Sequence, residues 1–168
     1  IDKLYAFRNI NVSCFNPEIL TNIKNTFVAK HESFPWRKIY ISRSKANYRK
    51  VLNERFLIPI LEKNGYEVLI LEELSIKSQI QIFSETKIVL GLHGAGLTNM
   101  LFMKKGGKIA ELRADTDEKG IYNVFFCMAN ACGLDYYYLF GKGDHCKNKF
   151  SNISIPVDDL INLLSKLD

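Results

Sequence analysis

A run of seven residues, His93-Gly94-Ala95-Gly96-Leu97-Thr98-Asn99, has the residue types and the spacing of an anion-binding turn. It follows a β-branched run over residues 87–92 and leads into an apolar segment that can form a helix. Such a turn presents unpaired backbone N–H groups and the positive end of a helix dipole to whatever lies above the sheet. Phosphate is the ligand that this arrangement usually binds.

Each residue type in this turn contributes a different interaction. Gly94 and Gly96 permit backbone angles with φ > 0 and let a ligand approach the main chain, and Thr98 could add a side-chain hydrogen bond. His93 stands where the strand stops, so its imidazole could donate to a phosphate oxygen or, when protonated, offset charge on a leaving group. Turns with two glycines are also common in α/β domains generally, so the turn alone leaves a purely structural role open.

Two better-known phosphate motifs do not match the same residues. The dinucleotide fingerprint G-x-G-x-x-G fails because Asn99 stands where its third glycine should be. The P-loop pattern fails because Leu97 stands where its lysine should be. These mismatches argue against a dinucleotide cofactor and against an ATPase of the P-loop type.

A basic segment is the second feature that could bind an anion. Between residues 37 and 55, Glu54 is the single acid among seven basic residues: Arg37, Lys38, Arg43, Lys45, Arg49, Lys50 and Arg55. The alternative is a solvated basic face with no ligand. No zinc-finger spacing, RNP-like strand or helix-turn-helix layout accompanies the cluster, so nucleic acid is not an expected partner.

The elements that must position these residues alternate along the chain. From residue 38 onward, short apolar runs alternate with longer amphipathic ones, which is typical of a parallel sheet in an α/β fold. Strands are expected over residues 38–42, 66–71, 87–92, 108–112 and 134–140, and helices over 17–30, 48–64, 75–85, 97–104, 121–131 and 157–167. Ligands of such sheets bind beyond the carboxyl ends of the strands, where Arg43, His93 and Glu111 are expected.

Length and composition fit one globular domain. The 168 residues are 47% hydrophobic with a formal net charge of +5, which is enough for one core. We expect a domain over residues 37–168, with residues 1–36 a connector or the remnant of a preceding domain. No run approaches the ~18 apolar residues of a membrane span. No signal-peptide pattern opens the chain, and the four cysteines lack metal-site spacing.

A series of short motifs, in order along the chain, resembles glycosyltransferase family 61: Ile41-Ser42-Arg43, Arg49, Asn53-Glu54, Ser75, Gln79, the turn at residues 93–99 and Glu111-Leu112. The resemblance covers residues 37–140, and the combination is far more specific than any one motif. It implies a GT-B architecture, in which two Rossmann-like domains face each other. This chain resembles the C-terminal one, a parallel sheet with helices on both faces that binds the nucleotide-sugar donor.

The resemblance implies an enzyme that transfers a sugar from a nucleotide-diphosphate sugar to a glycan or protein-linked acceptor. Transfer is expected to invert the anomeric centre and to need no metal or other cofactor. Complete members are longer, so an N-terminal domain that contacts the acceptor is expected to be missing, and this chain alone need not be active. The family includes bacterial enzymes of polysaccharide biosynthesis and eukaryotic secretory-pathway enzymes, and the composition favours the bacterial cytoplasm over the secretory lumen.

The resemblance also suggests a role for each candidate residue. Arg43 and Arg49 are expected to pair with the diphosphate, because guanidinium forks match phosphate oxygens. The amides of Gly94, Ala95, Gly96, Leu97 and Thr98 complete the cradle, and His93 is the expected catalytic residue. Glu111 is expected either to bind the ribose hydroxyls or to be a surface carboxylate. Asn53 and Gln79 fit structural roles better than donor contacts.

Two other functions stay open. Asp115-Thr116-Asp117 has the D-x-D spacing with which metal-dependent GT-A glycosyltransferases hold a divalent cation, although this leaves the turn at residues 93–99 without a role. Alternatively, the chain is a binding module that holds a nucleotide or phosphorylated ligand without turning it over. A chelator tests the first alternative, and a turnover assay tests the second.

Overall fold

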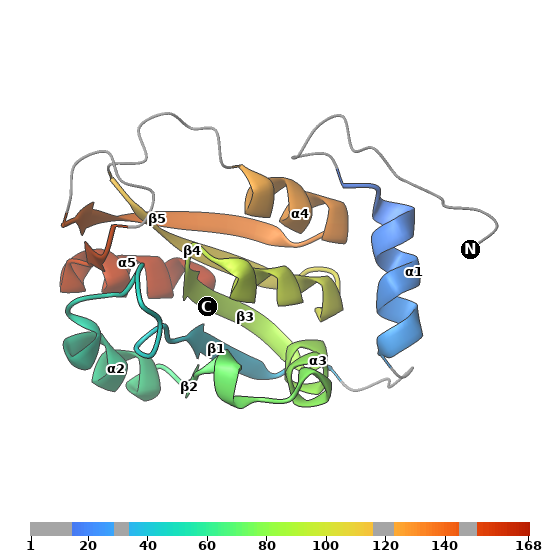
Figure 1. The fold of residues 1–168 in the computed structure, drawn as a ribbon, viewed down its shortest axis with the longest axis horizontal. Helices are drawn as coiled ribbons and strands as arrows, with labels where there is room; N and C mark the ends of the chain where they lie inside the picture. The colour runs from blue at the N-terminus through green and yellow to red at the C-terminus, as the bar shows by residue number, and fades with distance from the viewer. Residues whose placement is uncertain (1–14, 29–33, 116–122, 145–150) are drawn as a thin grey trace.

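The computed structural model describes residues 15–28, 34–115, 123–144 and 151–168. A mostly parallel sheet runs through the molecule, and helices cover both of its faces (Figure 1). This is the Rossmann-like α/β arrangement that the alternating apolar runs predict. No helix within these ranges has the length and apolar character needed to cross a membrane.

Six strands form the sheet in the order β2-β1-β3-β4-β5-β6. The parallel strands are β1 (Arg37–Ile41), β2 (Tyr66–Leu69), β3 (Thr86–Leu92), β4 (Lys108–Ala114) and β5 (Asp135–Gly143), and β6 (Ile153–Ser154) pairs antiparallel with β5. From β1 the chain moves to β2 on one side and then crosses to β3 on the other. The sheet therefore has a topological switch point between β1 and β3.

The helices that connect the strands have clear local causes. Their bounds are α1 (Pro17–Phe27), α2 (Glu54–Lys63), α3 (Ile76–Ser84), α4 (Val124–Cys132), α5 (Val157–Leu167) and the 3₁₀ helices η1 (Leu71–Glu73) and η2 (Ala95–Phe102). The Ser75 side chain caps α3 by accepting from the Ser78 amide at 3.1 Å. Gly133, with φ 69°, ends α4 in the left-handed region that glycine favours.

Two hydrophobic clusters enclose the sheet. On one face α2 and α5 pack against the strands, through Leu57, Leu61, Leu160 and Leu164. On the other face α3, η2 and α4 supply Phe83, Met100 and Met128. Because successive strand residues point to opposite faces, Ala110 and Leu112 of β4 join the first cluster and Ile109 joins the second. Glu111 and Arg113 share the second face with Ile109, beneath η2 and α4.

Helix α1 packs against η2 and α4 at the second face. Lys24 donates from Nζ to the Met103 carbonyl, and the Phe27 and Phe102 rings meet edge to face with centroids 6.5 Å apart. The described part of residues 1–36 is therefore in contact with the α/β unit. The domain boundary expected at residue 37 stays a prediction.

Most observed elements lie where the sequence predicts them, with ends shifted by a few residues, and the larger differences are local. The helix expected over residues 48–64 begins at Glu54, because the preceding residues form turns and a bridge from Val51 to Ile153. The helix after the turn at residues 93–99 is a 3₁₀ helix, and β6 was not predicted. A two-residue strand carries no periodicity from which it could be recognised.

Candidate functional site

The carboxyl ends of β1 and β3 meet at the switch point of the sheet. Arg43 lies two residues beyond the end of β1, and His93 directly follows β3. In open α/β sheets ligands bind at such a switch point, because the connections leave it toward opposite sides of the sheet. We call the region between the loops that follow β1 and β3, which carry Arg43 and His93, the crevice. The structure thus brings together the two motifs that the sequence singled out.

Arg43 and Gly94 are in direct contact across this crevice. A Cβ atom built on Gly94 would lie 2.6 Å from Nη1 of Arg43, so the absence of a side chain makes room for the guanidinium. Arg43 is also anchored through Nε, which donates to the Arg49 carbonyl at 3.1 Å. Neither Gly94 nor Gly96 uses the left-handed conformation that glycine permits, since Gly94 is extended with φ 167° and Gly96 is not among the positive-φ residues. At Gly96, a Cβ would instead press on Leu71 at 3.1 Å.

Arg49 lies beside Arg43 in an unusual backbone conformation. Its φ of 56° makes it a non-glycine residue in the left-handed region, which costs about 1–2 kcal/mol. Its Nε atom is buried and has no hydrogen-bond partner among the described residues. Burial lowers the pKa of Arg43, and the like charge of Arg49 lowers this pKa further. Neither guanidinium forms an ion pair within the described ranges. Two like charges this close together can be neutralised by a bound anion.

The backbone of the turn at residues 93–99 adds amide donors. The Leu97 amide is used by the 3₁₀ helix, since it donates to the Gly94 carbonyl at 3.0 Å. The amides of Gly94, Ala95 and Gly96 precede the first helical hydrogen bond and have no partner in the part of the chain that the structure describes. Thr98 is exposed, whereas the side chain of Leu97 is buried in the core. Of the amides expected to contact a phosphate, those of residues 94–96 have no described partner, whereas the Leu97 amide is already hydrogen-bonded.

His93 is held in a fixed orientation by three contacts. Its amide donates to the Leu112 carbonyl at 2.9 Å, and its Nδ1 atom is hydrogen-bonded to Oε1 of Glu111. The ring meets Phe125 of α4 edge to face, with centroids 5.1 Å apart. These contacts fix both the position and the plane of the imidazole.

Glu111 is fully buried, so the alternative that it is a surface carboxylate is wrong. Its second oxygen, Oε2, accepts from the hydroxyl of Tyr136 on β5. Burial, followed by the charge of Glu111, raises the pKa of Tyr136, and the hydroxyl stays a donor. Arg113 is 7% exposed and lies nearby, and its Nε has no hydrogen-bond partner within the described ranges. Both carboxylate oxygens are thus occupied by protein groups, and the predicted ribose contact of Glu111 stays untested.

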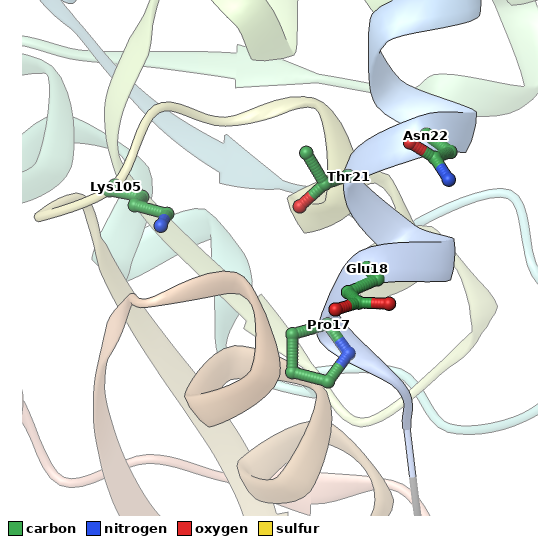
Figure 2. A pocket seen from close by; sticks show the side chains of 5 residues that line it. All are labelled: Pro17, Glu18, Thr21, Asn22 and Lys105. Atoms are coloured by element: carbon green, nitrogen blue, oxygen red, sulfur yellow. The ribbon is translucent and has the colours of Figure 1, made fainter.

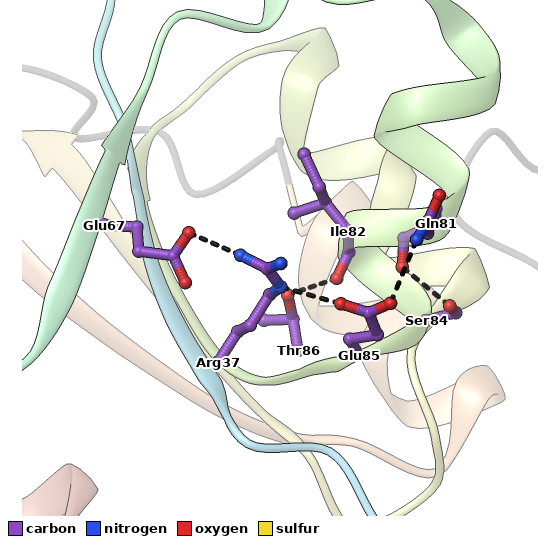
Figure 3. A network of polar contacts seen from close by, with 7 residues as sticks. All are labelled: Arg37, Glu67, Gln81, Ile82, Ser84, Glu85 and Thr86. Carbon is purple, nitrogen blue, oxygen red and sulfur yellow. Dashed lines mark hydrogen bonds and ion pairs between the residues drawn. The ribbon is translucent and has the colours of Figure 1, made fainter. Parts of the chain in front are cut away.

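Three other residues of the basic segment form ion pairs with carboxylates. Figure 3 shows Arg37 at the amino end of β1, between Glu67 and Glu85, with its Nε 2.8 Å from Glu85. Lys38 pairs with Asp168 and Lys45 with Glu73. Arg37, Lys38 and Lys45 are therefore neutralised by protein carboxylates, whereas Arg43 and Arg49 lie together beside the turn at residues 93–99.

Two further motif residues have the structural roles that were predicted. The side-chain amide of Asn53 donates from Nδ2 to the Ile155 carbonyl at 2.7 Å and accepts at Oδ1 from the Ile155 backbone N–H at 3.0 Å. Gln79 donates to the carbonyls of Leu71 and Leu74 and accepts from Asn99 at 2.9 Å. Both predictions are confirmed, since each side chain ties a helix or its start to a neighbouring segment.

Other candidate features lie elsewhere. An open pocket of about 450 Å³ lies between α1 and Lys105, and its lining residues surround a solvent-facing hollow (Figure 2). Lys105 precedes β4, so this pocket is at the amino ends of the strands. In the D-x-D motif Asp115 accepts from the Gly143 amide at 2.9 Å, while residues 116–117 lie outside the described ranges. Within those ranges no group of three metal-ligating side chains occurs.

Sequence comparisons identify the proteins that this chain resembles. The family model Glycosyltransferase 61 matches residues 1–110, which is more than half of the chain and starts well before residue 37. An EGF domain-specific O-linked N-acetylglucosamine transferase of Drosophila melanogaster is 34% identical over 148 residues, covering 77% of this chain and 28% of the relative. The enzyme of that name from Rattus norvegicus is 29% identical over 147 residues, covering 76% and 27%.

A second kind of relative is a protein O-linked-mannose β-1,4-N-acetylglucosaminyltransferase 2 of Takifugu rubripes, 29% identical over 116 residues, covering 67% of this chain and 20% of the relative. The chain spans about a quarter of the length of the relatives it matches. These relatives are animal proteins, which gives no support to the bacterial cytoplasm that the composition favoured. The extent of the family match and the identity to the fly enzyme lead to one conclusion: the chain belongs to glycosyltransferase family 61.

Proposed function

We propose that this chain is the donor-binding half of a glycosyltransferase that moves a sugar from a nucleotide diphosphate to a glycan or protein-linked acceptor. The observation that carries the proposal is the pair Arg43 and Arg49 at the switch point of the sheet, beside the amides of residues 94–96, which have no partner among the described residues. Planar guanidinium groups and amides at a helix start are the donors that phosphate oxygens prefer.

The chemistry follows from where charge develops during transfer. As the anomeric carbon leaves the diphosphate, negative charge builds on the leaving oxygen. Donors that already point at that position stabilise it without reorganising. Arg43 is suited to this role because Gly94 and the Arg49 carbonyl hold its guanidinium in place. In this scheme the two arginines offset the diphosphate charge and no metal ion is required.

The names of the relatives suggest the sugar and the acceptor class. Both kinds of relative are named for the transfer of N-acetylglucosamine, one to EGF domains and one to O-linked mannose. We therefore infer a nucleotide-diphosphate N-acetylglucosamine as donor, a protein-linked acceptor, and the lumen of the secretory pathway as the place of action. The acceptor contacts and a facing second domain are assigned to the part of the protein outside this chain.

Calorimetry with UDP-, GDP- and CMP-sugars tests donor binding. We expect one nucleotide class to bind and Arg43→Glu to weaken its affinity by at least about 10²-fold, since the reversal both removes a charge-assisted hydrogen bond and repels the diphosphate. Arg55→Glu is the matched control, because Arg55 is exposed on α2 and its reversal changes the net charge equally. Equal losses for the two variants would assign the binding to net charge and refute the site.

The alternative of a binding module requires a separate assay. Transfer and donor hydrolysis measured on the complete protein, with UDP-N-acetylglucosamine and an O-mannosylated or EGF-domain acceptor, decide between turnover and simple binding. Binding without turnover in the complete protein would favour the module.

A further inference from the structure

Glu111 determines which nitrogen of His93 carries the proton. An ionised carboxylate accepts hydrogen bonds and donates none. One oxygen of Glu111 is hydrogen-bonded to Nδ1 of His93 and the other to the Tyr136 hydroxyl, so Nδ1 must be the donor of its bond. In the neutral imidazole the lone pair then belongs to Nε2. The network therefore assigns the proton to Nδ1 and the proton-accepting lone pair to Nε2.

We propose that Glu111 is the positioning residue that makes His93 the general base of the transfer reaction, accepting the proton of the acceptor hydroxyl on Nε2. This inference rests on the proposed function and names a role for His93 different from a phosphate contact. A neutral imidazole with its proton on Nδ1 has no hydrogen on Nε2 to give to a phosphate oxygen. Arg43 and Arg49 supply the donors for the diphosphate.

In this role of His93, sugar transfer is a single displacement at the anomeric carbon. The O–H bond of the acceptor breaks, its proton passes to Nε2 of His93, and the acceptor oxygen forms a bond to the anomeric carbon. The bond from that carbon to the diphosphate oxygen breaks, and the leaving group departs with the electron pair. His93 becomes an imidazolium, which the buried carboxylate of Glu111 compensates, as an acidic partner does in other catalytic pairs. Deprotonation to solvent restores the neutral ring.

The surroundings of His93 favour this division of roles. From β4, Arg113 lies on the same face as Glu111, and from β5 the Tyr136 hydroxyl holds the second carboxylate oxygen. From the loop after β1, Arg43 and Arg49 lie on the diphosphate side. Helix α4 contributes the ring of Phe125, and η2 contributes no titratable side chain. The carboxylate is thus the anionic group facing His93 among the described residues.

Nitrogen-15 NMR of labelled histidine tests the positioning without any ligand. The 168-residue chain has three histidines, and the His93→Gln spectrum assigns the one of interest. At a pH where the ring is neutral, we expect Nδ1 to carry the proton in the native chain. We expect Glu111→Ala to abolish this preference, because the acceptor is gone. Glu111→Leu, which also cannot accept a hydrogen bond, is the second variant if the alanine variant does not fold, and we expect the same result from it.

Glu54→Gln is the matched control for this experiment. Glu54 also accepts from two hydroxyl groups, Tyr40 at 2.8 Å and Ser42 at 3.1 Å, but it does not touch His93. We expect its replacement to leave the tautomer of His93 unchanged. A native ring protonated on Nε2, or an unchanged Nδ1 proton in both Glu111 variants, would overturn the positioning role.

Kinetics on the complete protein test the base role. We expect His93→Gln to lower kcat for transfer by at least about 10²-fold and Glu111→Gln to lower kcat in the same direction. The affinity for UDP should stay within about threefold in both variants, whereas Arg43→Gln weakens it. A loss of UDP affinity in His93→Gln as large as in Arg43→Gln would make His93 a diphosphate contact and overturn the base role. If the native protein bound no nucleotide sugar, the proposed function would be refuted, and the base role of His93 would be refuted with it.

Discussion

Replacing Gly94 by alanine separates binding from stability at the crevice. The backbone of Gly94 is extended, with φ 167° and ψ 168°, a conformation that any residue adopts. The new Cβ would lie 2.6 Å from Nη1 of Arg43, and the nitrogen would have to withdraw by roughly an ångström to reach ordinary contact. Because the obstructing group is the end of a flexible side chain, we expect little change in the melting temperature.

The expected loss lies in nucleotide affinity. Arg43 is anchored by the bond from its Nε to the Arg49 carbonyl at 3.1 Å, and a displaced guanidinium cannot keep both this bond and its direction toward the diphosphate. A charge-assisted hydrogen bond contributes about 1.5–3 kcal/mol. Losing its geometry but keeping the charge should cost about half of that, which corresponds to roughly a tenfold increase in Kd.

A double-mutant cycle decides whether the effect passes through Arg43. In calorimetry with UDP, Gly94→Ala should weaken binding in the native background and add almost nothing to Arg43→Gln, because the group that it displaces is already gone. Gly65→Ala is the control: Gly65 has φ 79° with open space around its Cβ position, so the change should cost about 1–2 kcal/mol of stability and leave UDP affinity unchanged. Additive losses in the cycle would show that Gly94 acts independently of Arg43 and refute this reasoning.

Three further predictions concern parts of the molecule outside the crevice. Asn53→Ala removes both hydrogen bonds to Ile155, and chemical denaturation should show a loss of about 1–3 kcal/mol with unchanged UDP affinity; lower affinity without a loss of stability would contradict the structural role. Arg37→Ala breaks the contacts to Glu67 and Glu85 and should lower the melting temperature without weakening UDP binding, and weaker binding would mean that the basic segment acts as a unit after all. A chelator should leave donor binding unchanged in calorimetry, whereas a manganese requirement would favour the D-x-D alternative.

The fold could be predicted largely because its elements are long and periodic. Helix α5 has the bounds that the sequence predicts, and β3 ends at Leu92 as expected. The predicted start of α2 was too early because residues 48–53 have the composition of a helix, whereas the bridge from Val51 to Ile153 ties them to a segment a hundred residues away. Propensity cannot anticipate such a contact, since it depends on tertiary packing.

The candidate site was predicted in its loops but not in its internal contacts. Arg43 and His93 could be assigned to strand ends from sequence alone. The pairing of His93 with Glu111 depends on β3 lying beside β4, with Gly91 opposite Glu111, and that order is not a local property. Tyr136 lies in the strand expected over residues 134–140, and nothing in its run of three tyrosines indicates which hydroxyl will reach a buried carboxylate. Predicting these contacts would have required the register of β3, β4 and β5 in the sheet.

The charges around the crevice lead to a last prediction from the proposed diphosphate site. Arg37, Lys38 and Lys45, in the same segment as Arg43, each pair with a carboxylate. Arg43 and Arg49 lie together with no ion pair among the described residues, and the second of them has a strained backbone and a buried, unpartnered Nε. The like charges and the unpartnered Nε cost stability, and under the proposed function a bound diphosphate would offset both. A nucleotide diphosphate should therefore raise the melting temperature of the native chain, and this increase should be much smaller in Arg43→Gln.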